Sequence, residues 1–144
     1  MISVKLRSRL RVVGVTKDIE RKLAAPLLAS GALVQTEART ALGVQGPSAS
    51  PGDSMAYYNK DLGAWVKAST PPNPPHRQTG KLRSSVQTGM LSKNEVIISA
   101  NAPYAKYYEA EYGSVASRSR PFMRPSLVKS ISRIVRSFYK FVGI

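Results

Sequence analysis

The chain has 144 residues, 42% of them hydrophobic, which suits one domain with a modest core and leaves little room for a second. It has no cysteine and a single histidine, His76, so a disulfide framework and a thiolate or zinc site are excluded and no cofactor is expected. The 22 basic residues outnumber the 8 acidic ones and give a formal net charge of +14, which predicts a polyanion or an acidic protein as partner.

The sequence does not favour a membrane as partner. No run of about 18 apolar residues occurs, and the N-terminus lacks an apolar run before a cleavage-like site. The only tryptophan, Trp65, lies in a loop-like region and not in a basic helix that would anchor at a membrane surface. We therefore expect a soluble protein that is assembled in the cytoplasm.

Residues 4–12 alternate between two sides, which is typical of a half-buried strand, and the predicted strand spans residues 3–13. The polar side of this strand carries a basic ladder of Lys5, Arg7, Arg9 and Arg11. Two interpretations remain open. The ladder is either a solvated strand face that discourages edge-to-edge pairing, or a contact with phosphate or with an acidic ring of a neighbouring subunit.

Apolar residues at helical spacing predict one long helix over residues 17–42. Pro26 lies near its middle. Because proline lacks a backbone donor and clashes with the preceding turn, we expect a kink or a break into two pieces there.

Residues 43–78 are predicted to form a loop insertion, because Gly, Pro, Ser and Asn dominate and the periodicity is lost. The insertion carries several apolar side chains, among them Trp65. These side chains either dock on a partner or fold back on their own domain.

Residues 82–90 and 95–100 are predicted to pair as antiparallel strands, with the second strand the better candidate for the core. A short helix over residues 104–110 would follow, with Tyr104 and Tyr107 among its tyrosines. Tyrosine rings at such a place usually close over a core with the hydroxyl in water, so we favour packing over base binding.

The last predicted helix spans residues 125–142 and has an apolar side and a basic side. The apolar side is Leu127, Val128, Ile131, Ile134, Val135, Phe138, Phe141 and Val142. The basic stripe is Lys129, Arg133, Arg136 and Lys140. No acidic residue occurs between Ser114 and Ile144 to neutralise this stripe, so it is either a solvated face or an intermolecular contact.

The predicted elements together indicate an α+β fold. A small antiparallel sheet would pack against the long N-terminal helix and the amphipathic C-terminal helix, with the loop insertion between them. The acidic residues are scattered and no phosphate-binding loop or nucleophile motif is present, so we expect no enzymatic activity. We also find no helix-turn-helix, zinc-finger or RNA-binding strand motif.

Four short blocks stand in a fixed order between residues 78 and 127. They are Thr79-Gly80-Lys81-Leu82-Arg83-Ser84-Ser85, Pro103-Tyr104-Ala105-Lys106-Tyr107-Tyr108, Glu111-Tyr112-Gly113-Ser114 and Arg120-Pro121-Phe122-Met123-Arg124-Pro125. Through these blocks the chain resembles the tail-completion and head-tail joining proteins of long-tailed bacteriophages, a group that includes the minor tail protein Z-like family. The family usually has one glutamate in the third block, and either Glu109 or Glu111 holds its place here.

The resemblance implies a structural virion protein that joins tail to head as one subunit of a homo-oligomeric ring, a hexamer or a dodecamer. Its partners would be adjacent neck, connector or tail-tube proteins, and its location the tail or neck of the virion, after assembly in the host cytoplasm. The interface and motif candidates are Trp65, Thr79, Gly80, Leu82, Arg83, Tyr104, Tyr107, Glu109, Glu111, Gly113, Pro121, Phe122 and Arg124.

Within this interpretation, Phe122 would be a buried anchor, and Arg124 would pair with Glu109 or Glu111 or face a partner. Direct contact with packaged DNA stays open. The alternatives are a basic protein that binds nucleic acid without reading its sequence, and a tail-terminator ring.

Overall fold

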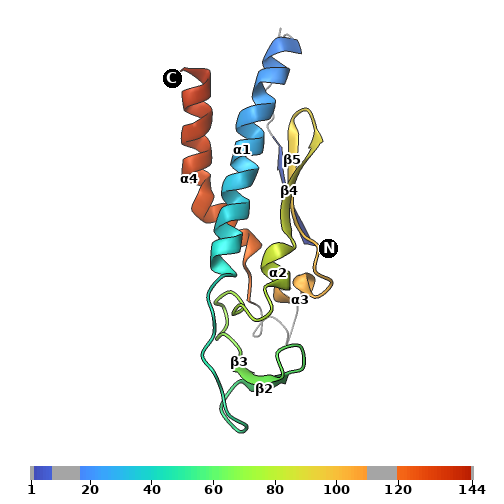
Figure 1. Cartoon of the computed structure of the whole chain (residues 1–144). Coiled ribbons are helices and arrows are strands. Elements are labelled where there is room, and N and C mark those ends of the chain that lie inside the picture. Colours follow the sequence, from blue (N-terminus) through green and yellow to red (C-terminus); the bar gives the residue numbers. More distant parts are fainter. Residues whose placement is uncertain (1, 8–16, 110–119, 144) are drawn as a thin grey trace.

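The computed structural model in Figure 1 describes residues 2–7, 17–109 and 120–143. Its elements are β1 (Ile2–Arg7), α1 (Lys17–Ala41), β2 (Ala56–Asn59), β3 (Ala64–Lys67), α2 (Lys81–Ser84), β4 (Val86–Ser92), β5 (Glu95–Ala100), α3 (Ala105–Glu109) and α4 (Met123–Val142). An antiparallel sheet packs against a long helix and a C-terminal helix, so the predicted α+β class is confirmed.

The main sheet has the strand order β1-β5-β4, and both pairings are antiparallel. The central strand β5 buries Val96, Ile98 and Ala100 on the face that meets the helices, as expected for the core strand. In β1, Val4 pairs with Ile98 and packs against the same core, whereas Lys5 on the opposite face is exposed. The predicted half-buried strand is therefore confirmed over residues 2–7.

The prediction for Pro26 was a kink or a break, and the break is wrong, because α1 is one continuous helix (Figure 1). The ring of Pro26 is buried, and the Ser30 hydroxyl donates to its carbonyl at 2.7 Å. The carbonyl that loses its donor belongs to Lys22, four residues earlier, which is exposed and can be hydrated. The helix can therefore continue through the proline.

Gly31 brings α1 close to the sheet. A Cβ at this position would lie 2.6 Å from Thr88 Cγ2 and 3.0 Å from Val96 Cγ2, so a larger side chain does not fit without movement. The Thr88 hydroxyl donates to the Gly31 carbonyl at 3.2 Å. The glycine in the middle of the helix is thus explained by close packing on β4 and β5.

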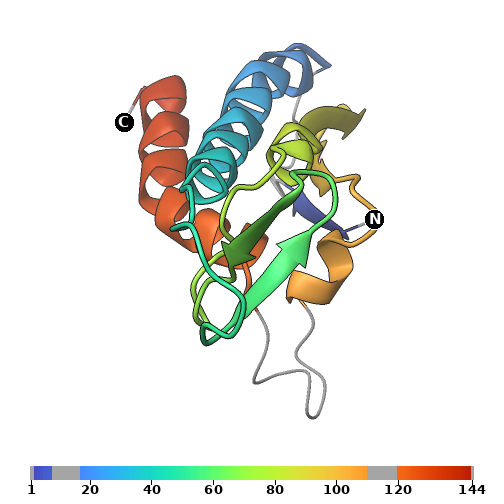
Figure 2. The ribbon, with the colours of Figure 1, turned by 60° about the horizontal axis from the view of Figure 1, so that its bottom comes forward.

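α4 runs antiparallel to α1, and the two helices lie side by side in both views (Figures 1 and 2). It begins at Met123, two residues before the predicted start. Its buried side includes Met123, Ser126 and Ser130, each with at most 2% of its surface exposed. The two serine hydroxyls donate to the carbonyls of Phe122 and Ser126, which satisfies them inside the helix.

The apolar side that was predicted for α4 is buried only in part. Leu127, Ile134 and Phe138 pack against the core, but Val128, Ile131 and Val135 are exposed. The small, internally bonded serines let α4 approach α1 on the serine side of the helix. That orientation turns a second set of apolar residues toward solvent.

The predicted strand over residues 82–90 is wrong in its first part, because Lys81–Ser84 form the short helix α2 and the strand begins at Val86. Gly80 has a φ of 81°, in the left-handed region that glycine tolerates best, and turns the chain into α2. The Ser84 and Ser85 hydroxyls then donate to the carbonyls of Lys81 and Leu82. These local bonds favour a helical turn over an extended strand.

The insertion over residues 43–78 contains a hairpin, β2–β3, which the loss of periodicity did not predict. Asn59 stabilises its turn, because the side-chain oxygen of Asn59 accepts hydrogen bonds from the backbone N–H groups of Asp61 and Leu62. Tyr58 and Trp65 pair across the strands with ring centroids 5.9 Å apart in an edge-to-face arrangement. The insertion lies at the end of the molecule where α1 ends and α4 begins (Figure 1).

Candidate functional site

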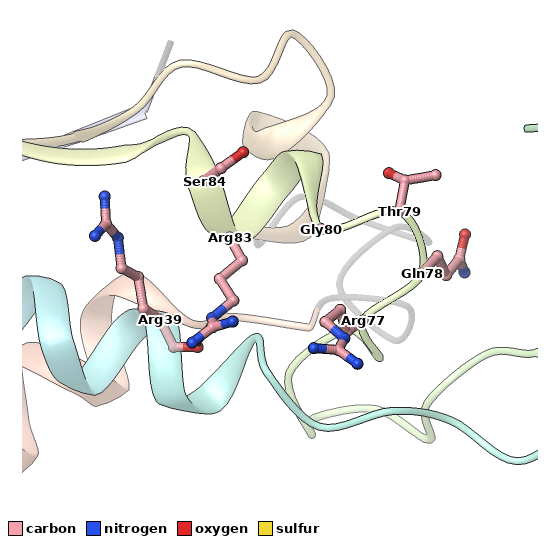
Figure 3. Close-up of a pocket in the computed structure, with 7 residues that line it drawn as sticks. All are labelled: Arg39, Arg77, Gln78, Thr79, Gly80, Arg83 and Ser84. Atoms are coloured by element: carbon pink, nitrogen blue, oxygen red, sulfur yellow. Dashed lines mark hydrogen bonds between the residues drawn. The ribbon is translucent and has the colours of Figure 1, made fainter.

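The first motif block borders an arginine-lined hollow of about 600 Å³ at the end of α1 (Figure 3). Its lining residues are Arg39, Arg77, Gln78, Thr79, Gly80, Arg83 and Ser84. α1 supplies Arg39, the end of the insertion supplies Arg77, and α2 supplies Arg83. Residues that are far apart in the sequence thus form one basic surface.

The three arginines donate to neutral oxygen atoms, and Arg77 does so from Nη2 to the side-chain oxygen of Gln45 at 3.5 Å. Arg39 donates from Nε and Nη2 to the Val86 carbonyl at 3.1 and 2.8 Å. Arg83 donates from Nε to the Arg39 carbonyl at 3.2 Å, at the C-terminal end of α1 where the helix dipole favours a cation. Figure 3 shows Arg77 and Arg83 directed toward this end of α1, and Arg39 directed toward the segment after α2.

The positive charge of the three arginines is not neutralised by an acidic residue in the lining of the hollow. Among the described residues that form it, none is Asp or Glu. Guanidinium groups present several N–H donors in one plane and match carboxylate or phosphate oxygens. The arrangement is therefore suited to binding an anionic group, while it offers neither a histidine nor a carboxylate pair for acid–base chemistry.

A second hollow of about 330 Å³ adjoins the first and shares Arg77 and Arg83 with it. Tyr57 from the hairpin, Tyr104 and Tyr108 also line it. The rings of Tyr104 and Tyr108 meet edge to face, with centroids 6.3 Å apart. Tyr57 of the insertion thus lies beside its own domain, whereas Met55, Tyr58 and Leu62 are exposed, so both alternatives that the sequence left open stay open.

Burial raises the pKa of the Tyr108 hydroxyl, and the nearby Tyr104 raises it further, against an opposing effect of Arg120. Burial also raises the pKa of Tyr57, with a further increase from Tyr108. Because tyrosine already titrates near 10, both groups stay neutral at physiological pH. They provide ring surface and hydroxyl hydrogen bonds, not charge.

Arg120 ties the start of the last block to the insertion. Its backbone N–H donates to the Tyr108 carbonyl at 2.9 Å, and its Nε donates to the buried Ser69 carbonyl at 2.8 Å. Phe122, two residues after Arg120, is fully buried, as predicted from the motif. Arg39 and Arg77 were not singled out from the sequence, because nothing in their local pattern distinguishes them from other surface arginines, and Arg120 was named only as the first residue of the fourth block.

The remaining motif candidates are placed as follows. Thr79 accepts a 3.4 Å hydrogen bond from the Lys81 N–H, Leu82 packs against the core, Pro121 is half-buried and Arg124 is exposed. Glu111 and Gly113 lie outside the described residues, and the side chains of Tyr107 and Glu109 are outside the description as well. The expected pairing of Arg124 with Glu109 or Glu111 therefore stays a prediction.

Lys5 and the four cations of the α4 stripe are not among the residues that line the hollow. Lys5 is exposed on β1, while the side chain of Arg7 and the whole of Arg9 and Arg11 lie outside the description. The α4 stripe of Lys129, Arg133, Arg136 and Lys140 is exposed, and Arg133 pairs with Glu37 of α1.

Comparisons with protein-family models, with curated proteins and with solved structures found no match to this chain. Among the described residues, no helix combines the length and apolar character that crossing a membrane requires. In the same part of the chain, no group of three or more histidine, cysteine or acidic residues is arranged to hold a metal ion.

Proposed function

We propose that the protein is a structural subunit of the head–tail interface of a long-tailed bacteriophage, assembled as a homo-oligomeric ring. The observation that carries this proposal is the ordered series of motif blocks between residues 78 and 127. The fold supports the proposal, because the first, second and fourth blocks lie together near the C-terminal end of α1. Leu82, Tyr108 and Phe122 all pack into the same core there.

The proposed mechanism is binding without turnover. The arginine-lined hollow would take carboxylates of a neighbouring subunit or of an adjacent neck, connector or tail-tube protein. The hairpin, in which the exposed Tyr58 pairs with the half-buried Trp65, would add aromatic contact area. Identical subunits around a symmetry axis form a closed collar, either a hexamer or a dodecamer. In this role the protein is located in the virion, at the tail or neck, and a tail-terminator ring is the nearest variant.

Light scattering of the purified protein over a concentration series tests this proposal. We expect a ring mass that does not depend on DNA, and we expect Arg77→Glu to shift the equilibrium toward the monomer by removing one cation of the hollow. Lys93→Glu, with the same charge change in the exposed β4–β5 turn, is the matched control. A protein that is monomeric at every concentration and does not bind isolated phage tails contradicts the proposal.

A second candidate function is favoured by the charge of +14 and by the hollow without acidic lining. In it, the basic surfaces would contact DNA phosphates without reading the sequence. Such binding loses affinity steeply and linearly on logarithmic axes as salt rises. A weak affinity for a short duplex with a flat salt dependence would exclude this candidate, and a steep dependence with a monomeric protein would favour it over the ring.

A further inference from the structure

The arginine-lined hollow and the second hollow beside it share most of one wall. We call the second one the tyrosine-lined hollow, because Tyr57, Tyr104 and Tyr108 line it. Five of the seven residues around the arginine-lined hollow also line the tyrosine-lined hollow, among them Arg77 and Arg83. The volumes of about 600 and 330 Å³ are typical of ligand sites in proteins. One ligand can therefore reach both hollows, with the two arginines at their boundary.

Arg77 and Arg83 keep most of their donors for a ligand. The guanidinium of Arg77 donates to Gln45 from Nη2 only, and that of Arg83 donates to the Arg39 carbonyl from Nε only. A guanidinium has several N–H donors in one plane. Among the described residues, the other donors of these two groups have no protein partner. Both arginines are directed toward the C-terminal end of α1 (Figure 3), so they can meet one oxyanion together.

The two hollows differ in charge. None of the described residues that line the arginine-lined hollow is acidic. In the tyrosine-lined hollow, the carboxylate of Asp61 pairs with the ammonium group of Lys81 at 3.4 Å, and both residues belong to the lining. The positive charge that is left over therefore lies at the arginines, at one end of the combined site. A matching ligand carries its negative charge at one end and is neutral at the other.

The tyrosine rings form a corner with accessible surface. The rings of Tyr104 and Tyr108 lie 6.3 Å apart between centroids and at 85° to each other. Tyr57 and Tyr104 have exposed fractions of 37% and 39%, so part of each ring can contact a ligand. An aromatic side chain in such a corner can meet the face of one ring and the edge of another, which are the contacts that aromatic pairs prefer.

These features select among ligands. A single-stranded nucleic acid stacks its bases on flat ring faces and carries a charge at every nucleotide. Here the rings of Tyr104 and Tyr108 are nearly perpendicular, and the unpaired charge lies at one end. A peptide with one carboxylate beside an aromatic side chain places a single charge at the arginines and a neutral ring among the tyrosines.

We propose that the two hollows together bind a protein segment in which a glutamate or aspartate stands next to an aromatic residue. The carboxylate accepts hydrogen bonds from Arg77 and Arg83, and the aromatic ring packs against the tyrosines. This inference rests on the proposed function, since it specifies which carboxylates the arginine-lined hollow takes. Light scattering separates the two. A monomeric protein that binds such a segment would defeat the ring alone, and a ring that does not bind it would overturn only this inference.

The test titrates the isotope-labelled full chain with a short peptide, blocked at both ends, in which one glutamate precedes one phenylalanine. Two matched peptides replace the glutamate with glutamine or the phenylalanine with alanine. The protein is kept at a concentration where light scattering gives the smallest mass, so that neighbouring subunits do not compete for the site. We expect the amide signals of residues 77–83 to move and those of the β4–β5 turn to stay. The first peptide should bind at least about fivefold more tightly than either matched peptide.

Variants of both hollows identify their contributions. Arg77→Gln removes a cation but keeps the backbone N–H that donates to the Val44 carbonyl, so it should weaken binding of the glutamate peptide and not of the glutamine peptide. Tyr104→Ala removes an exposed ring and should cancel the preference for phenylalanine over alanine. Lys93→Gln and Tyr139→Ala make the same changes at exposed positions outside both linings and should keep both preferences. A dispersed amide spectrum shows that each variant folds.

Several outcomes would overturn the proposal. Equal affinity for the glutamine peptide would show that the arginines do not select a carboxylate, and equal affinity for the alanine peptide would show that the tyrosines do not select a ring. Inorganic phosphate that binds as tightly at the same amides would make this a site for a simple oxyanion. Tighter binding of a single-stranded oligonucleotide there would assign the site to nucleic acid. Absence of any shift at residues 77–83 would leave the site without this ligand.

Discussion

Phe122 is the residue that fixes where α4 leaves the sheet. It precedes the helix, is completely buried and belongs to the core cluster that α1, β4 and β5 share. We predict that Phe122→Ala lowers the free energy of unfolding by about 3–5 kcal/mol, because a large cavity forms where the ring was. Urea unfolding measures this change.

The control for that prediction is Val128→Ala on the exposed side of the same helix. It should change the stability by less than about 0.5 kcal/mol, as surface substitutions do. A loss below about 1 kcal/mol for Phe122→Ala would contradict the placement of its ring in the core.

Gly31 allows a second test at the scale of one residue. Gly31→Val places branched carbon atoms against Thr88 and Val96, so we predict a loss of about 1–3 kcal/mol from overpacking. Ala32→Val introduces the same side chain at the next, exposed position of α1 and controls for helix propensity. Similar thermal midpoints for the two variants would show that α1 does not approach the sheet this closely.

At the scale of elements, the position of the insertion depends on hydrogen bonds to distant segments. The Arg77 N–H donates to the Val44 carbonyl at 2.7 Å, which closes the insertion at its base. Arg120 holds the segment after β3 through the Ser69 carbonyl. Neither link is local in sequence, so the hairpin is stable only when the body is folded around it.

We predict that Arg120→Met loosens the insertion. Losing a hydrogen bond from a charged donor to a buried carbonyl costs about 1.5–3 kcal/mol, and this should promote local opening more than global unfolding. Chymotrypsin digestion, mapped by mass spectrometry, should then cut faster near Tyr57 and Trp65. Lys129→Met removes a cation from the exposed side of α4 and should leave these cleavage rates unchanged.

At the scale of the whole molecule, the net charge of +14 opposes the compact state. The described residues contain few neutralising pairs, such as Lys81 with Asp61 at 3.4 Å, where both side chains are well exposed. Repulsion among the remaining cations should therefore be strong at low ionic strength.

Added salt should stabilise the protein for this reason. We predict that the urea midpoint rises between about 10 and 150 mM NaCl, where the Debye length falls from about 30 to 8 Å. Arg136→Glu with Lys140→Glu should reduce the salt dependence, because the charge falls and attractive pairs become available. A midpoint that falls with salt would indicate that attractive pairs dominate the folded state.

The sequence alone determined the long helices, the central strand and the burial of Phe122. Strong periodicity over residues 17–42 and 125–142 needs no distant partner to be recognised, and the apolar run in β5 is typical of a core strand. Composition and net charge are also fixed by the sequence, because they are sums over single residues and do not depend on the fold. The ordered motif blocks, which carry the functional proposal, are also a property of the sequence.

Only the tertiary structure decided which side of α4 is buried, where α2 replaces a strand, and that a hairpin forms in the insertion. Ser126 and Ser130 are buried on the α4 helix, which packs against α1, and this contact is not encoded in α4 itself. The arginine-lined hollow likewise needs α1, α2 and the end of the insertion in place at once. The periodicity of a segment shows which of its residues lie on the same side. Which of these residues are buried depends on the shape of the helices and strands that pack against the segment.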